Sequence, residues 1–170
     1  MKQFVSFDPK QWQANPFTEL DDRWMLITAK ANGRVNTMTA SWGGFGVIWN
    51  KNTATAYVRT TRFTRELMDV ADTFSLTFFD KEYQETLRML GTLSGRDSDK
   101  MEKCGLTVTE IDGTPVFEQA HTAIVCKKLY RQLMERDCMV DKELYDKFYS
   151  DTNAPHYLYI GEIVGAYSRA

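Results

Sequence analysis

The sequence is poor in the residues that build metal sites and disulfide frameworks. Its 170 residues include only two histidines, His121 and His156, and three cysteines, Cys104, Cys126 and Cys138. The cysteines form no CxxC pair, and a structural zinc site needs four ligands at close spacing, so no metal site is expected. We expect free, partly buried thiols in a reducing cytoplasm.

Long apolar runs are also missing. No stretch approaches the roughly 18 consecutive apolar residues of a membrane span. The apolar start at residues 4–7 is too short and too soon interrupted to act as a signal peptide. We therefore expect a soluble, cytoplasmic protein without a membrane partner.

The charge is balanced rather than of one sign. Lys plus Arg number 21 and Asp plus Glu number 23, which gives a net charge of −2. A chain without a basic excess offers no long-range attraction to a polyanion, so nucleic acid is not an expected partner. With 43% hydrophobic and 13% aromatic residues, the chain can fill one core, and we expect a single domain over residues 1–170.

The local pattern is mainly that of β-strands. Asn32-Gly33 separates two β-prone runs and predicts a hairpin with a type I′ turn. The predicted strands are 24–29, 34–41, 45–49, 53–60, 74–79, 105–111, 120–133 and 156–167. The predicted helices are 65–71, 82–90 with Asp80 as its cap, 97–103 and 142–149. The first 23 residues are expected to be irregular. This pattern favours a mainly β fold, a closed or nearly closed antiparallel barrel with peripheral helices.

Three arginines and three threonines lie close together where a predicted strand gives way to a helix. They are Thr60, Thr61 and Thr64, and Arg59, Arg62 and Arg65. A helix start favours an anion, and guanidinium and hydroxyl groups bind phosphate oxygens. The alternative is a solvated turn in which Thr61 or Thr64 caps the helix. The clustering of arginines in an acidic chain favours the phosphate site.

A second polar segment, Ser94-Gly95-Arg96 followed by Lys100, precedes another short predicted helix. It can add donors to the same anion site. The alternative is a capping turn made by Asp97 or Ser98.

A third segment runs from Asn36 through Ser41 and Trp42 to Gly43-Gly44-Phe45-Gly46. Its small residues and glycines would let a flat heteroaromatic ring lie against strand backbone. The alternative is a barrel strand whose glycines only allow a bend. The segment matches neither GxGxxG nor a P-loop.

The two histidines differ in position. His121 lies in a predicted apolar strand and is interpreted as structural. His156 stands at the head of the last predicted strand, where it can face a cleft and serve as a catalytic side chain. The alternative for His156 is a satisfied histidine at the edge of the sheet.

Four sequence blocks follow one another in order between Trp24 and Tyr167. They are Asn36-x-Met38-Thr39-Ala40-Ser41-Trp42-Gly43-Gly44; Arg59-x-x-Arg62-x-Thr64 followed by Phe74-Ser75-Leu76; Ser94-Gly95-Arg96-Asp97-x-Asp99-Lys100 followed by Gly105-Leu106-Thr107; and His156-x-Leu158-x-Ile160-Gly161-Glu162-Ile163. Together these blocks resemble the flavoredoxin branch of the flavin reductase-like family, whose members have the FMN-binding split β-barrel fold.

The resemblance implies a homodimer that binds FMN non-covalently near the subunit interface. By similarity, the isoalloxazine ring would lie on the backbone of Met38, Thr39, Ala40, Ser41 and Trp42, with a polar contact from Asn36. The phosphate would be held by Arg59, Arg62, Phe63 and Thr64, helped by Ser94, Gly95, Arg96 and Lys100.

The function implied is that of an FMN-dependent oxidoreductase of the flavin reductase type, with NAD(P)H as electron donor and His156 as the candidate catalytic side chain. The alternatives are an electron carrier reduced by a partner protein and an FMN-binding module without catalysis of its own. Residues 134–155 depart from the family pattern as a helical insertion before the last strand, which we expect to cover the flavin or to change the dimer surface.

Overall fold

The computed structural model of the protein describes residues 3–96 and 100–170. The strands are β1 (Phe4–Ser6), β2 (Met25–Ala31), β3 (Arg34–Ala40), β4 (Gly43–Ile48), β5 (Lys51–Arg59), β6 (Thr73–Phe78), β7 (Val108–Ile111), β8 (Thr114–Phe117), β9 (Thr122–Leu133) and β10 (His156–Arg169). The α-helices are α1 (Phe63–Val70), α2 (Gln84–Thr92), α3 (Lys100–Lys103) and α4 (Lys142–Phe148). Single turns of 3-10 helix lie at Pro9–Gln11, Lys81–Tyr83 and Arg136–Cys138, and a π-helical turn at Thr18–Arg23. The predicted mainly β fold with peripheral helices is confirmed.

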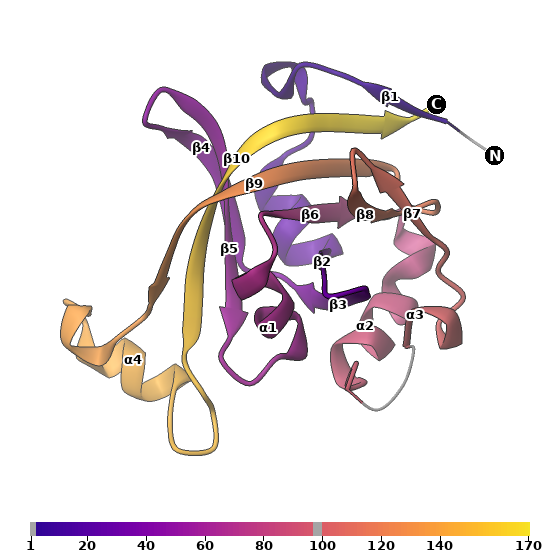
Figure 1. Cartoon of the computed structure of the whole chain (residues 1–170). Coiled ribbons are helices and arrows are strands. Elements are labelled where there is room, and N and C mark those ends of the chain that lie inside the picture. Colours follow the sequence, from indigo (N-terminus) through magenta and orange to yellow (C-terminus); the bar gives the residue numbers. More distant parts are fainter. Residues whose placement is uncertain (1–2, 97–99) are drawn as a thin grey trace.

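One strongly curved antiparallel sheet forms the body of the molecule (Figure 1). Its strands follow the order β3-β2-β6-β9-β10-β5-β4, with β1 added beside β10. β3 and β4 are joined in sequence but stand at opposite ends of this order, so the barrel is open between them. β7 and β8 form a separate hairpin.

Three two-residue turns have positive φ at both central residues, as type I′ geometry requires. The predicted turn at Asn32-Gly33 is confirmed, with φ of 52° and 74°. Asp112-Gly113 likewise joins β7 to β8, with φ of 50° and 77°. Between β4 and β5 the turn is Trp49-Asn50, slightly earlier than residues 50–52, which the predicted strands 45–49 and 53–60 leave between them.

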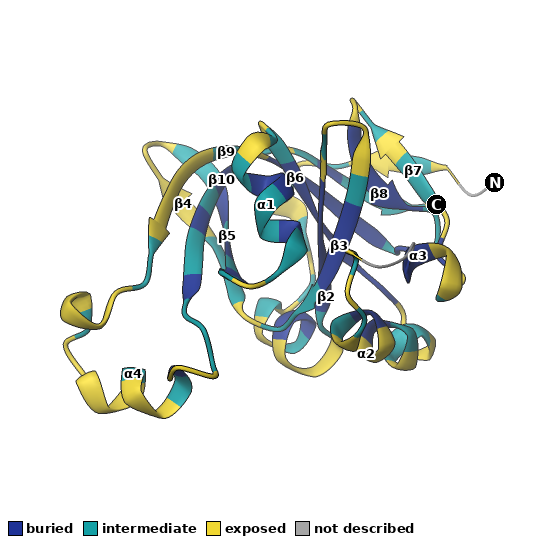
Figure 2. Cartoon of the chain, turned by 60° about the horizontal axis from the view of Figure 1, so that its bottom comes forward, coloured by how far each residue is buried: buried dark blue, intermediate teal, exposed yellow. Residues whose placement is uncertain are grey.

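Side chains of β2 enter two different cores. Met25 and Ile27 point into the barrel, while Leu26 joins a second cluster under α2 and α3 with residues such as Leu87 and Phe117. Successive side chains of a strand point to opposite faces, so both faces of β2 are buried (Figure 2). This double burial explains why the run that starts at Trp24 is continuously apolar rather than alternating.

The prediction of an irregular N-terminal lead-in is wrong in part. β1 pairs with β10, Phe4 opposite Arg169. The Trp12 ring packs against Phe45 and Phe78, at 4.9 and 5.4 Å between ring centroids. Both contacts join residues far apart in the chain, so local sequence pattern does not show them.

Several local predictions are also corrected. Asp80 stands before the 3-10 turn, but its carboxylate accepts a hydrogen bond from Arg169 (3.0 Å) and does not cap the helix. α1 begins after Arg62, so neither Thr61 nor Thr64 is its cap. His121 lies before β9 rather than inside a strand. Of the predicted helix 97–103 the structure shows α3, and residues 97–99, which include the proposed caps, lie outside the described residues.

Residues 134–155 form an arm that projects from the barrel and carries α4, close to the predicted helix 142–149 (Figures 1 and 2). Asp141 caps this helix by accepting from the Leu144 amide (3.1 Å). Arg136 donates two hydrogen bonds, of 2.6 and 2.7 Å, to the Asp146 carboxylate and so connects the two sides of the arm.

The cysteines are free thiols, as predicted: Cys126 is buried, Cys104 half-buried and Cys138 exposed. Across residues 3–96 and 100–170, no helix combines the length and the apolar character needed to cross a membrane.

Candidate functional site

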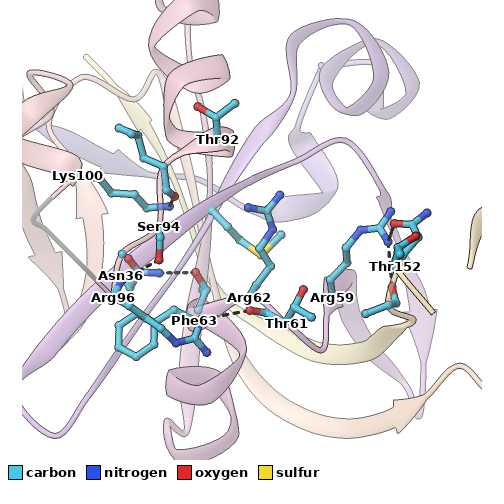
Figure 3. A pocket seen from close by; sticks show the side chains of 16 residues that line it. Asn36, Arg59, Thr61, Arg62, Phe63, Thr92, Ser94, Arg96, Lys100 and Thr152 are labelled. Atoms are coloured by element: carbon cyan, nitrogen blue, oxygen red, sulfur yellow. Dashed lines mark hydrogen bonds between the residues drawn. The ribbon is translucent and has the colours of Figure 1, made fainter. Parts of the chain in front are cut away.

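Two adjoining cavities lie beside the free edge of β3, with volumes of about 300 and 240 Å³. They share Met38, Arg59 and Arg62 as a common wall. The first is also lined by Asn36, Phe63, Thr64, Ser94, Gly95, Arg96 and Lys100, and the second by Thr39, Ala40, Ser41, Trp42 and His156. All the residues that the sequence marked as cofactor-binding or catalytic candidates therefore line one or both of these adjoining cavities. Figure 3 shows the lining of the first cavity.

Three chain segments converge on these cavities because of the strand pairing. β10 runs antiparallel to β5 so that His156 lies opposite Arg59 at the end of both strands. The chain then turns from β5 into α1, which packs on β2 and β3. Residues 93–96, which directly follow α2, line the other side of the first cavity.

Arg62 reaches across the first cavity from the start of α1. Its Nη1 donates to the carbonyl oxygen of Gly91 at the end of α2 (2.8 Å). Burial and the nearby Arg59 guanidinium both lower the pKa of Arg62. A guanidinium that is half-buried beside another cation would gain from a nearby anion.

Lys100 is the most deeply buried cation of the site, with only 2% of its surface exposed. Its Nζ donates to the carbonyl oxygens of Leu90 (3.0 Å) and Leu93 (3.2 Å). Burial and the charge of Arg62 lower its pKa to about 8. Among the described residues that line the first cavity there is no carboxylate, so the cavity carries an excess of positive charge.

Arg59 is held by the arm. Its Nη1 donates to the side-chain oxygen of Asn153 and to the carbonyl oxygen of Ala154 (2.9 Å). These contacts fix the guanidinium at the border of the two cavities. The returning chain of the arm thus forms one wall of the site.

Arg96 is already partly neutralised. Its guanidinium contacts the Glu66 carboxylate, donates to the carbonyl oxygen of Thr61 (3.3 Å) and lies over the Phe63 ring. Arg34 lies over the same ring, 4.4 Å from its centroid. The Ser94 hydroxyl accepts from the Arg96 amide (3.2 Å), so Ser94 also shapes its own turn.

Asn36 and Thr64 form a buried pair on the floor of the first cavity. The Asn36 amide donates to the Thr64 hydroxyl (2.7 Å), which leaves the hydroxyl hydrogen free to donate. Gly95 lies directly on this pair: a Cβ at residue 95 would stand 1.9 Å from the Asn36 oxygen. A glycine is therefore required here for packing.

The second cavity is bordered by strand backbone. β3 ends the sheet order, so its outer edge presents N–H and C=O groups that no described strand binds. The Thr39 hydroxyl donates to the Leu87 carbonyl (2.5 Å), which attaches α2 to β3. The glycine at 43 serves packing, since a Cβ there would stand 2.9 Å from the carbonyl oxygen of Thr55.

His156 lies in the second cavity with 6% of its surface exposed. Its Nδ1 shares a hydrogen bond with the Tyr149 hydroxyl (3.0 Å), and its ring is 5.0 Å from that of Trp42. Burial, Arg59 and Arg62 lower its pKa to about 4. The imidazole is thus neutral near pH 7 and can accept or donate one further hydrogen bond through Nε2.

Some lining residues were not predicted from the sequence. They are Thr61, Thr92, Leu93, Thr152, Asn153 and Ala154 in the first cavity and Tyr57 in the second. Thr61 belongs to the threonine-rich segment already noted. Thr152, Asn153 and Ala154 lie just before His156, but only the pairing of β10 with β5 puts them beside Arg59. In the described part of the chain, no group of His, Cys, Asp and Glu side chains could hold a metal.

The depressed pKa of His156 predicts a pH-dependent stability. In the unfolded chain His156 takes up a proton below its ordinary pKa of about 6.5. In the folded protein the pKa is about 4, so the side chain stays neutral until the pH falls to that value. The contribution of neutral His156 to the free energy of unfolding is therefore fully present above pH 6.5 and is lost as the pH falls from about 6.5 towards 4. In urea unfolding, His156→Gln should reduce the loss of unfolding free energy between pH 7.5 and 4.5 by about 2 kcal/mol. An unchanged loss in the variant would contradict this assignment.

Comparison with known proteins identifies the family. The model of the family described as "Flavin reductase like domain" matches residues 20–170. The comparison with curated proteins gives no match.

Solved structures with the same fold come from several flavoproteins. An FMN-binding domain of a flavin reductases-like enzyme from Shewanella baltica OS155 is 19% identical, with a TM-score of 0.71 over 99% of this chain and 78% of that one. Flavoredoxin from Methanosarcina acetivorans is 20% identical, with a TM-score of 0.67 over 86% and 68%. The Streptomyces globisporus NADH:FAD oxidoreductase SgcE6 is 14% identical, with a TM-score of 0.63 over 87% and 75%. At these identities the likeness establishes the shared barrel fold, and the match to the family model shows that this chain belongs to the flavin reductase-like domain family.

Proposed function

We propose that the protein is an FMN-dependent oxidoreductase of the flavin reductase type. The observation that carries the proposal is the convergence of Arg59, Arg62 and Lys100 on one cavity next to an open strand edge. Family membership and the FMN-binding domain among the similar structures support FMN as the cofactor.

The first cavity suits the phosphate of FMN. A dianionic phosphate there would offset the repulsion between Arg59 and Arg62 and would give buried Lys100 an anionic neighbour. Arg62 and Arg59 are already oriented by carbonyl and amide oxygens, so little side-chain freedom remains to be lost on binding. The Thr64 hydroxyl supplies a neutral donor.

The second cavity suits the isoalloxazine ring. The outer edge of β3 from Met38 to Ala40, continued by Ser41, offers backbone donors and acceptors to the polar edge of a flat ring. Trp42 and His156 supply ring surfaces at the same cavity. When bound, FMN supplies a centre that accepts and donates two electrons, usually as a hydride.

The role proposed for His156 follows from its neutral state. With Nδ1 engaged by Tyr149, the imidazole is held in one orientation and can use Nε2 toward a molecule that enters the second cavity. It would position the electron donor or receive a hydrogen bond there, without contributing a charge at pH 7.

We propose NAD(P)H as the electron donor, by analogy with the NADH:FAD oxidoreductase among the similar structures. The flavoredoxin among them favours a second candidate, an electron carrier that a partner protein reduces. The two differ in whether the protein itself reacts with a nicotinamide nucleotide.

We also propose that the chain forms a homodimer. Exposed apolar side chains include Val47, Ile48 and Trp49 on the β4–β5 hairpin, Leu129 and Tyr130 on β9, and Val164 on β10. The ring centroids of Trp49 and Tyr130 lie 6.4 Å apart, so these two exposed side chains from different strands adjoin one another. Such an apolar surface is typical of an interface.

Absorption spectroscopy tests the donor. Purified protein loaded with FMN should show a flavin spectrum that bleaches on anaerobic addition of NADH or NADPH. A spectrum that stays oxidised with both nucleotides would favour the carrier. A protein that binds no added FMN would overturn the proposed function.

The phosphate site predicts a difference between two ligands. Arg62→Ala should weaken FMN binding by about 1.5–3 kcal/mol, because hydrogen bonds to a charged group are lost. The affinity for riboflavin, which lacks the phosphate, should change little. Quenching of flavin fluorescence measures both affinities. Arg88→Ala, which removes an exposed arginine of α2 outside both cavities, is the matched control. Equal losses for the two ligands would mean that Arg62 does not bind the phosphate.

The dimer surface predicts a shift in mass. Light scattering should give the mass of a dimer for the natural chain and of a monomer for Trp49→Lys, since a charge at an apolar interface is costly to bury. Val140→Lys places the same charge on a fully exposed site of the arm and should leave the dimer intact. A monomeric natural chain, or a dimeric Trp49→Lys variant, would refute the proposed interface.

A further inference from the structure

A third cavity, of about 470 Å³, adjoins the second. Ser41, Trp42 and Tyr57 line both, so the two cavities meet along these side chains. Gly43, at the start of β4, also lines the third cavity. The remaining walls come from segments outside the barrel strands: the π-helical turn with Leu20 and the arm with Met134 and Tyr149. Its volume falls within the range of about 300–1,000 Å³ that small-molecule sites occupy.

The walls of this cavity differ in chemistry from those of the phosphate cavity. They are mostly aromatic or aliphatic, with Phe17 and Trp42 exposed at 82% and 40%. Asp21 is the one charged side chain among the described residues that line it. A carboxylate disfavours an anionic ligand, and aromatic walls favour a flat apolar one.

The third cavity is physically linked to the site beside it. The Tyr149 hydroxyl, on its wall, shares the hydrogen bond with His156 in the second cavity. The Trp42 ring contacts Phe148 of α4 at 5.6 Å and His156 at 5.0 Å. A molecule held here would thus lie against the same Trp42 that borders the space assigned to the isoalloxazine ring.

We propose that this cavity binds a neutral, planar aromatic or quinoid molecule, and that Met134 and Asp21 select it by shape and charge. That the bound molecule acts as the electron acceptor rests on the proposed function. For a quinone, one hydride that originates on NAD(P)H and one proton (H⁺) taken up from the aqueous solution convert the quinone to the hydroquinone, and NAD(P)H is oxidised to NAD(P)⁺.

Binding of two matched probes tests the ligand class without any electron transfer. In calorimetry with FMN-loaded protein, the affinity for 2-naphthol should be at least about tenfold higher than that for 2-naphthoate, which has the same rings and a negative charge. Asp21→Asn removes the negative charge from the wall and should reduce the ratio of the two affinities. Equal binding of both probes to the natural chain would overturn the proposed selection by charge.

A cavity-filling variant tests the location. Met134→Trp should weaken 2-naphthol binding about tenfold or more, because the larger side chain occupies the cavity. Met134 lines neither of the other two cavities, so FMN affinity should stay unchanged. Met89→Trp, on the exposed face of α2, is the control and should change neither affinity. Undiminished 2-naphthol binding by Met134→Trp would overturn the proposal.

The proposed function and this inference fail in distinguishable ways. If the natural chain binds 2-naphthol in a manner that depends on Met134 and Asp21, the ligand class of the cavity is supported, whatever the outcome with NAD(P)H. If FMN binds and bleaches with NAD(P)H but 2-naphthol does not bind, the proposed function is supported and the aromatic site is refuted.

Discussion

The double pairing of β10 is the constraint on which the site depends. This strand pairs with β9 on one side and β5 on the other, and its register places His156 opposite Arg59. The residues just before His156 must then lie beside the Arg59 guanidinium, which Asn153 and Ala154 bind. A shift of one residue in this register would turn His156 to the other face of the sheet and separate it from Arg59. The barrel thereby fixes the border between the two cavities.

The fold also sets the charge of the first cavity. Half-buried Arg62 and buried Lys100 line the same cavity. Their side-chain hydrogen bonds to the described residues go to the carbonyl oxygens of α2 and the chain that follows it. Carbonyl oxygens orient a cation but do not neutralise it, so both groups keep lowered pKa values. The folded chain thus bears a local electrostatic cost that a bound phosphate would relieve. His156 is affected by the same cations and stays neutral.

Sequence pattern and structure agree best where the signal is local. The turns at Asn32-Gly33 and Asp112-Gly113 follow from the residues themselves, because few side chains tolerate positive φ. Helix α4 follows from its own periodicity. The N-terminal strand β1 and the packing of Trp12 escaped prediction because they depend on partners elsewhere in the chain. The same holds for the wall that Thr152, Asn153 and Ala154 form: nothing in their local sequence links them to Arg59.

The sequence by itself determined which residue types could hold a phosphate and a flat ring, and the order of its motif blocks indicated the family. Clustered arginines and hydroxyls carry that chemistry wherever they are placed, so a linear pattern can show it. Only the tertiary structure decided that Asn36, Arg62 and Lys100 meet at one cavity, that Gly95 must lack a side chain to lie on Asn36, and that the arm closes a third, aromatic cavity. These features arise from contacts between distant segments, and strand register and packing set such contacts rather than local preference.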